Sequence, residues 1–341
     1  MNIDIDTDAF EQVGKATERL VSGLRQERVW DGKQITEPGT YSNLPIETYH
    51  NDTALFGGDW SISSSGLRTI INRPLEWWYS SPFNPDRVEN ETNKALDFGK
   101  AAHMLLLGEQ GFAEAYALRP DHYPSDMDKP VKDRRKWNGN SHDCKAWLDW
   151  AAEGGKTVIT SDQIEVIRAI SDRLSQNDLV RHGILNGRIE RSIIAKDGDI
   201  WLRARPDVIP NSGGDFVDLK TAASVDDDSL SKAIYAHGYH IQAGFMRMVV
   251  RAVLGADAFQ SFTFVFVEKS APFDVRVKQL KDCDIDIGEK QAMHGLKIMR
   301  RCIEEDRWPG YDGWGDSASY TEMPAWARTR IENQINYGEA A

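Results

Sequence analysis

The stretch RIERSIIAKDGDIWLRARPDVIPNSGGDFVDLKT, residues 188–221, has the alternating periodicity and turn residues of consecutive β-strands. Asp197-Gly198 is a strong signal for a two-residue hairpin turn. Residues 211–214, Asn-Ser-Gly-Gly, form a second turn signal. The sequence therefore predicts three consecutive antiparallel strands, at about 188–195, 200–209 and 216–221.

The geometry of two such hairpins places charged side chains on one face of the sheet. If Asp197-Gly198 closes the first hairpin, Glu190 faces Arg205, with Asp207 two residues further on the same side. The second turn then places Asp207 opposite Asp218. Because side chains alternate along a strand, one face carries Glu190, Arg205, Asp207, Asp218 and Lys220. The other is a core face with Ile189, Ile193, Leu202, Ala204, Val208, Val217 and Leu219.

Directly opposed carboxylates are destabilising unless a cation offsets their repulsion. Carboxylate ligands with open water positions suit magnesium or manganese. A lysine beside such a metal can orient a water and help to deprotonate it, and the metal neutralises charge on a phosphoryl oxygen. The pattern indicates phosphodiester hydrolysis. The alternative is a solvated strand face, since a slip of one residue in register would scatter the set.

The rest of the chain predicts a compact α/β (α+β) protein. Ser residues before Gly66 form a helix N-cap signal, and Arg73-Pro74 stops that helix. Further helices are expected at 8–24, over NKALDFGKAAHMLLLGEQGF, and near 143–152, 161–176, 229–253, 286–306 and 324–336, with a hairpin over FTFVFVEKSAPFDVRV. We expect an extension at 1–55, a catalytic domain at 56–312 and a helical tail at 313–341.

Composition excludes several classes of protein. The 341 residues are 40% hydrophobic, too many for a disordered chain, and the net charge of −12 argues mildly against nucleic acid as a partner. No run approaches ~18 apolar residues, so no membrane span is expected. The acidic N-terminus lacks a signal-peptide pattern, so the cytoplasm is the expected location. Three scattered cysteines form neither a disulfide framework nor an iron–sulfur site.

Several segments resemble one known family. Asp207 followed by Asp218-Leu219-Lys220 resembles the signature of PD-(D/E)XK nucleases. The ordered segments SISSSGLRTIINRPLEWWY, DFGKAAHMLLLG, ARPDVIP, VDLKTAAS, GYHIQAGFM and FVEKSAPFDV are closer still to RecE-type exonucleases (exonuclease VIII) and their phage-encoded relatives. The resemblance implies a central mixed β-sheet with a three-strand antiparallel meander, flanked by helices.

The resemblance also implies an activity. Such enzymes are magnesium-dependent exonucleases, in which manganese is expected to substitute, and they degrade one strand of double-stranded DNA from its 5′ end. The product is a 3′ overhang for a single-strand annealing protein in recombination. Members of this kind form homo-oligomeric rings around DNA, which implies the cytoplasm of a bacterial or phage-infected cell.

The resemblance assigns roles to individual residues. It implies that His103, Glu190, Asp207 and Asp218 hold the metal, that the backbone carbonyl of Leu219 completes its shell, and that Lys220 orients the water. Without the resemblance, His103 reads as an ordinary histidine on an Ala/Leu helix.

Tyr239 and Gln242 match the Tyr-His-x-Gln element of the family. At i and i+3 on a helix they share a face, so they either contact DNA near the scissile phosphate or pack within the helix bundle. Met246 stands where a related QxxxY pattern has Tyr. Arg73, not Cys, precedes Pro74, so no iron–sulfur cluster is expected. His237 and His240 lack the further ligands that zinc needs.

Candidate DNA contacts are basic side chains. Arg68 and Arg73 are candidates for holding the 5′ phosphate, and Arg205 lies on the catalytic face. A loop at 123–141 offers Lys129, Lys132, Arg134, Arg135 and Lys136, although such a charge run is also typical of a solvated loop. A ring would gather basic residues into a channel and leave acidic residues outside. Alternatives are a structure-selective DNA endonuclease or a non-catalytic DNA-end-binding module.

Overall fold

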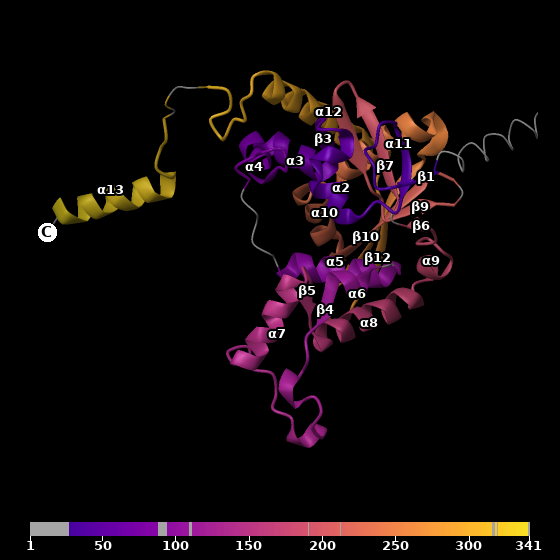
Figure 1. The fold of residues 1–341 in the computed structure, drawn as a ribbon. Helices are drawn as coiled ribbons and strands as arrows, with labels where there is room; N and C mark the ends of the chain where they lie inside the picture. Colours follow the sequence, from indigo (N-terminus) through magenta and orange to yellow (C-terminus); the bar gives the residue numbers. More distant parts are fainter. Residues whose placement is uncertain are drawn as a thin grey trace, which may run out of the picture.

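The computed structural model describes residues 27–87, 94–108, 111–189, 191–211, 213–315, 318 and 320–339. It shows an α+β protein built on two mixed five-stranded sheets with flanking helices, as the predicted fold class requires (Figure 1). The first sheet has the order β1 (Glu27–Val29), β2 (Gly39–Ser42), β7 (Ser192–Asp197), β8 (Ile200–Ala204) and β3 (Ser61–Ser63). The second has the order β12 (Val275–Gln279), β11 (Ser261–Glu268), β10 (Asp215–Ala222), β9 (Val208–Pro210) and β6 (Gly187–Ile189).

The predicted three-strand meander is divided between these two sheets, which corrects the prediction of one continuous sheet. Strands β7 and β8 pair in the first sheet, whereas β6 and β9 pair in the second. The segment 200–209 breaks at Arg205-Pro206 because proline has no backbone N–H to continue a ladder. The chain therefore passes from one sheet to the other just before Asp207.

The two predicted registers fared differently. In the first hairpin Asp197 faces Ile200, so Gly198-Asp199 forms the loop and Ile193 faces Ala204. This pairing is two residues away from the one that an Asp197-Gly198 turn requires. An even shift leaves every side chain on its expected face. In the second hairpin Val217 faces Val208, which confirms the predicted register and sets Asp207 beside Asp218.

The predicted helix at 229–253 is two helices, α10 (Asp227–Ala236) and α11 (Tyr239–Leu254). The break falls at Gly238, whose φ of +64° lies in the left-handed region that glycine adopts readily. Without a side chain this residue also fits against Arg68, whose Cδ would lie 2.7 Å from an added Cβ. The break starts α11 in a new direction, with Tyr239 and Gln242 in its first turn.

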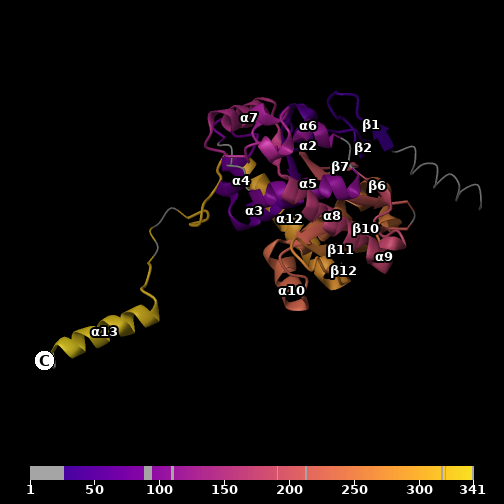
Figure 2. The same ribbon diagram turned by 90° about the horizontal axis from the view of Figure 1, so that it is seen from below.

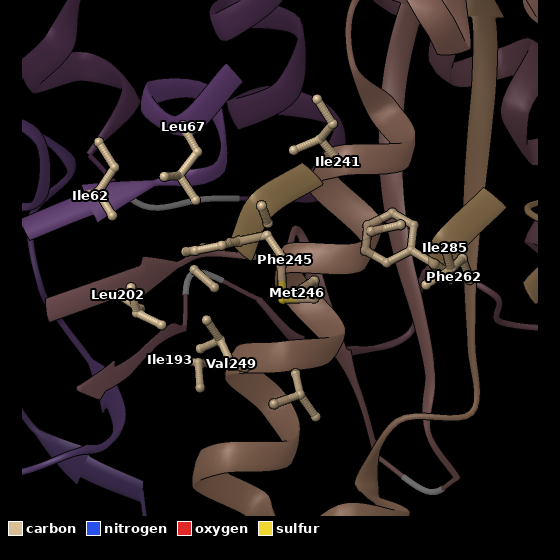
Figure 3. Close-up of a cluster of buried hydrophobic side chains, with 14 of the residues drawn as sticks. Ile62, Leu67, Ile193, Leu202, Ile241, Phe245, Met246, Val249, Phe262 and Ile285 are labelled. Atoms are coloured by element: carbon tan, nitrogen blue, oxygen red, sulfur yellow. The ribbon is translucent and has the colours of Figure 1, made fainter. Parts of the chain in front are cut away.

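Helix α11 lies between the two sheets and contributes Ile241, Phe245, Met246, Val249 and Val250 to the main core. Figure 3 shows Phe245 and Val249 among side chains of the first sheet, with Phe262 and Ile285 on the other side. Helix α12 (Asp282–Glu304) packs closely on α11 at Gly288, which has no side chain. A Cβ added there would lie only 1.8 Å from the His240 carbonyl oxygen. Met246 is buried in this core, so the position of the QxxxY tyrosine does not face solvent.

The other face of the second sheet is covered by α5 (Lys94–Leu107) and α8 (Ser161–Gln176). Val217, Leu219 and Val265 pack there against Ile170 of α8. Between α5 and α8 the chain forms a projecting lobe from α6 (Phe112–Ala115), β4 (Tyr116–Leu118), α7 (His142–Glu153) and β5 (Thr157–Ile159), with short 3₁₀ turns at Pro124–Asp126 and Val131–Asp133 (Figures 1 and 2). Helices α7 and α8 confirm the predictions near 143–152 and 161–176.

The remaining elements border this body. After β2, residues 44–56, with α2 (Ile46–Asn51) and a 3₁₀ turn at Thr53–Phe56, pack on the outer face of the first sheet against Ile194 and Trp201. Helices α3 (Ser64–Asn72) and α4 (Pro74–Ser80) follow β3, whereas α9 (Asp178–Arg181) and a turn at Ala256–Ala258 are short connections.

Helix α13 (Ala325–Glu339) stands apart from the body (Figures 1 and 2). The helix expected at 8–24 lies outside the described residues. Within the described ranges, no helix is both long and apolar enough to cross a bilayer.

Candidate active site

Two aspartates from different sequence segments meet at the centre of the second sheet. Asp218 lies in the middle of β10, and Asp207 lies on the link that enters β9. The pairing of Val208 with Val217 brings the two aspartates side by side. Asp218 is 1% exposed, and the Asp207 side chain is 12% exposed. Two adjacent, largely buried carboxylates are costly unless cations accompany them.

Asp207 is held by α5 and by the backbone of β10. Its Oδ2 lies 2.6 Å from His103 Nε2 and accepts a hydrogen bond of 2.6 Å from the Leu219 N–H. His103 is thus brought to the carboxylates from a distant part of the sequence, as the resemblance implied. The Leu219 peptide sits at the same place, between the two aspartates.

Asp218 is oriented by α11. Gln242 Nε2 donates a hydrogen bond of 2.8 Å to its Oδ1. Its Oδ2 forms an ion pair with Lys220, yet accepts no hydrogen bond of regular geometry from any described residue. Burial, and next the charge of Asp207, raise the pKa of Asp218 above its usual range. Asp218 Oδ2 therefore already faces one cationic group, the Lys220 ammonium, as a metal-binding carboxylate oxygen would face a metal.

Lys220 is the cationic member of the site. Burial opposes its charged form, but the neighbouring Asp218 and Asp207 outweigh this effect and raise the pKa of Lys220 above its usual value. Its Nζ lies 5.4 Å from the centre of the Tyr239 ring. Burial raises the pKa of Tyr239. Lys220 is thus a charged donor held between carboxylates and an aromatic ring.

The first turn of α11 contributes more than side chains. Its free N–H groups point along the helix axis and carry partial positive charge. Tyr239 and Gln242 both lie in this turn, and Gln242 reaches Asp218. An anion near Asp218 would therefore face the positive end of α11.

The described residues fit a divalent cation in part. No three His, Cys, Asp or Glu side chains among them converge closely enough to form a complete metal-binding set. Asp207 and Asp218 nevertheless offer hard oxygen donors of the kind that magnesium prefers, and Asp218 Oδ2 lacks a hydrogen-bond donor. Glu190, the third predicted ligand, lies outside the described residues. The donors present are the two carboxylates, the His103 ring beside Asp207, and the Leu219 peptide.

The candidate DNA contacts are spread over several places. Arg68 donates a hydrogen bond to the His237 carbonyl, next to the start of α11. Arg73 pairs with Glu76 and lies over the Tyr311 ring. Arg205 donates to the Leu44 carbonyl at 2.8 Å.

The basic loop lies on the projecting lobe. Asp126, which is 1% exposed, forms ion pairs with Lys129 and Arg135 and holds the loop together. Arg134 donates to the Lys129 carbonyl. Lys132, like Lys136, is exposed. Three of the five basic residues, Lys129, Arg134 and Arg135, thus have a structural role in addition to any contact with DNA.

Sequence reasoning missed three basic residues beside the site: His50, Lys100 and Arg203. Two signals pointed to them. Arg203 lies two residues before Arg205, and so on the same face of an otherwise apolar strand. Lys100 lies one helical turn before His103 and shares its helix face. The proximity of His50 depends on the packing of residues 35–56 and has no local signal.

Comparisons with known proteins give a family and a similar fold. A family model described as "PDDEXK-like domain of unknown function (DUF3799)" matches residues 83–321, more than half of the chain. No curated protein matches the chain. A putative exonuclease from Eubacterium rectale has a similar fold, with a TM-score of 0.53 and 15% identity over 84% of this chain and 98% of that one.

Two further structures are more distant. A phage-related exonuclease from Haemophilus somnus 129PT covers 73% of this chain and 97% of its own, with 12% identity and a TM-score of 0.30. An alkaline exonuclease from Laribacter hongkongensis covers 49% and 84%, with 11% identity and a TM-score of 0.24. TM-scores of 0.30 and 0.24 are too low to show that these two structures share the fold of this chain. The family match and the fold lead to one conclusion: this chain belongs to the family of PDDEXK-like domains, within the PD-(D/E)XK nuclease superfamily.

Proposed function

We propose that the protein is a magnesium-dependent exonuclease that degrades one strand of linear double-stranded DNA from 5′ to 3′. The observation that carries the hydrolytic part is the arrangement of Asp207, Asp218 and Lys220, with Asp218 buried and one of its oxygens without a hydrogen-bond donor. The 5′-to-3′ polarity and the 3′ overhang rest on the resemblance to RecE-type exonucleases.

The chain's own residues supply orientation and charge for this reaction. A divalent cation, when bound, lowers the pKa of a water ligand and neutralises charge on the phosphoryl oxygens. Asp207 and Asp218 are the residues to hold it, with Glu190 and the Leu219 carbonyl as further proposed ligands; manganese is expected to substitute for magnesium. Lys220 donates a hydrogen bond that orients the attacking water. Gln242 keeps Asp218 in one orientation, and the positive end of α11 faces the phosphate.

The proposed partners follow from the same resemblance. They are double-stranded DNA ends, further copies of this chain in a ring, and a single-strand annealing protein that takes up the overhang, in the cytoplasm of a bacterial or phage-infected cell. Exposed apolar residues on α13, including Trp326 and Ile335, suit a contact between copies.

The test uses linear and covalently closed circular duplexes, labelled at either 5′ or 3′ ends where ends exist, with and without magnesium. The proposal expects release of 5′-labelled mononucleotides from linear duplex only, in the presence of magnesium, while the 3′ label stays on the strand, in the growing 3′ overhang. Cutting of the closed circle would instead support a structure-selective endonuclease. Binding to ends without any turnover would support a DNA-end-binding module.

A further inference from the structure

A group of basic side chains lies at the end of α2, close to the candidate active site. We call it the α2 basic cluster; its members are His50, Lys100, Arg203 and Arg205. The guanidinium carbons of Arg203 and Arg205 lie 5.2 and 5.8 Å from the centre of the Tyr49 ring. The His50 ring lies 4.9 Å from the same ring, edge to face. Tyr49 thus stands in the middle of the cluster.

Arg203 is buried without a negative partner. It is 7% exposed, and it forms no ion pair with any carboxylate among the described residues. One terminal nitrogen donates to the Tyr49 carbonyl, whereas its Nε has no hydrogen-bond partner. Burial lowers the pKa of Arg203, which reflects the cost of keeping this charge out of water.

The other members do not relieve this imbalance. Arg205 donates to the Leu44 carbonyl, and neither Lys100 nor His50 is part of an ion pair in the described chain. Burial, followed by the charges of Arg203, Lys100 and Arg205, lowers the pKa of His50 to about 4. Lys100, Arg203 and Arg205 therefore form an excess of positive charge, with His50 as a neutral neighbour.

The acidic side chains of the same segment are engaged elsewhere. Glu47 accepts a hydrogen bond from Asn51, one helical turn away on α2. Asp52 caps the backbone N–H of Ala54 at 2.8 Å. Neither carboxylate forms an ion pair with the cluster, so the missing negative charge has to come from outside this segment.

The cluster borders the candidate active site along two elements. Arg205 precedes Asp207 by two residues on the link between the sheets. Lys100 lies on α5 one turn before His103, so the two side chains share a helix face. An anion bound by the cluster would be a near neighbour of the phosphate held at the carboxylates.

We infer that the α2 basic cluster is a subsite for a backbone phosphate of the DNA strand, next to the phosphodiester that is cut. This inference rests on the proposed nuclease function. A phosphate supplies the missing charge, and its oxygens suit the donor fork of a guanidinium. Lys100 is exposed and lines the open side, and the His50 ring, partly covered against Tyr49, can add its N–H there.

A purely structural role makes different demands. Arg203 and Arg205 alone would suffice to tie the carbonyls of Leu44 and Tyr49 to the first sheet. Lys100 forms no hydrogen bond or ion pair within the described residues, so a structural role does not account for its position. Lys100 and His50 are therefore the residues that separate a phosphate subsite from a structural clamp.

The experiment replaces single backbone phosphates near a duplex end by neutral methylphosphonates, one position at a time. Binding to each duplex is measured by fluorescence anisotropy without divalent metal, for the wild type and for Lys100→Ala, His50→Ala and the control Lys297→Ala. Lys297 is an exposed lysine of α12 outside the cluster. Thermal melts confirm that each variant is folded.

One methylphosphonate position is expected to weaken binding by the wild type and by Lys297→Ala about tenfold, and to weaken binding by Lys100→Ala and His50→Ala much less. The slope of log K against log salt should fall by about 1 for Lys100→Ala. Equal losses in all four proteins, or Lys100→Ala binding as tightly as the wild type, would overturn the subsite.

A parallel assay keeps the two proposals apart. If the wild type with magnesium does not cut DNA, the proposed function fails, and the metal-free binding comparison still decides on its own whether the cluster holds a backbone phosphate. If the wild type cuts but the cluster variants retain full affinity, the subsite fails alone.

Discussion

Gln242 Nε2 donates a hydrogen bond of 2.8 Å to Asp218 Oδ1, and so joins the first turn of α11 to the middle of β10. Helix α11 is fixed in turn, because Phe245 and Val249 are buried between the two sheets. The orientation of a buried carboxylate is thus set by the hydrophobic core through one amide.

Replacing Gln242 by Ala should lower turnover by about 10- to 100-fold with little change in KM, because it removes a group that positions Asp218 and not one that binds substrate. Steady-state kinetics on linear duplex measure both constants. Gln260→Ala, at an amide outside the site, is the control. A rise in KM with unchanged kcat would show that Gln242 contacts DNA instead.

Asp218→Asn should abolish digestion of linear duplex, with a loss of about 10³-fold or more in turnover, since it removes a carboxylate donor for the metal. The metal-free variant should melt at the wild-type temperature or above it. Its buried carboxylate has a raised pKa beside Asp207, so its charge is a cost to the metal-free fold.

Magnesium should raise the melting temperature of the wild type, corresponding to about 2.7 kcal/mol at a concentration 100 times its Kd, and should have much less effect on Asp218→Asn. Differential scanning calorimetry with and without magnesium measures this. An equal shift in both proteins would place the metal elsewhere.

Lys220→Met should reduce turnover far more than magnesium affinity, because Lys220 is assigned to orient water. Single-turnover rates and calorimetric titration of magnesium separate the two effects. Lys220→Arg tests whether charge alone suffices; its planar head group does not reproduce an ammonium held between Asp218 and the Tyr239 ring. Equal losses of turnover and of metal affinity would argue against the assignment.

Gly238→Ala should destabilise the fold by about 2 kcal/mol and also lower activity. An alanine at position 238 has to adopt the left-handed backbone conformation of Gly238. Its Cβ also displaces the Arg68 side chain at the start of α11. Gly58→Ala is the matched control: it has a φ of +88° and open space around it, so it reports the backbone cost alone, about 1 kcal/mol. If both variants lose the same stability and keep full activity, the contact with Arg68 does not position α11.

The projecting lobe should lose protection from trypsin at acidic pH. Hydrogen bonds from Arg135, then Lys129, hold the pKa of Asp126 far below its usual value. A lowered pKa means that this stabilisation is complete above the ordinary Asp pKa of ~3.9 and declines progressively as the pH falls from there through the lowered pKa of the folded state. An acid-active protease reports the same opening where trypsin is slow.

Asp126→Asn should be cleaved faster than the wild type at pH 7 and should show a smaller change between pH 7 and pH 3. Asp128→Asn, at an exposed acidic residue two positions away, is the control. A wild-type lobe that is equally resistant at both pH values would remove Asp126 as its anchor.

Local signals in the sequence predicted much of this fold. Turn residues, caps and periodicity located α3, α7, α8, α12 and the hairpin of β11 with β12, and the second turn set Asp207 beside Asp218 correctly. The predicted register of the first hairpin was wrong by two residues. A two-residue loop that contains Gly198 can be either Asp197-Gly198, as predicted, or Gly198-Asp199, as observed. The side-chain faces survived this error only because the shift is even.

Long-range packing accounts for what could not be predicted. The division of the strands between two sheets depends on partners such as β2 and β3, which lie more than a hundred residues away in sequence. The break at Gly238 depends on the approach of Arg68 from α3. The basic surroundings of His50 arise from three separate segments, so no local pattern marks them.

The passage of the chain from β8 to β9 has a mechanical consequence. Asp207 lies on the short link between the two sheets, whereas Asp218 is inside a strand of the second sheet alone. A rotation of one sheet relative to the other therefore changes the distance between the two carboxylates, because the Arg205-Pro206 link transmits the movement of the first sheet to Asp207. A ligand or neighbouring subunit that binds the outer edge of the first sheet would therefore change the distance between the Asp207 and Asp218 carboxylates without touching either one.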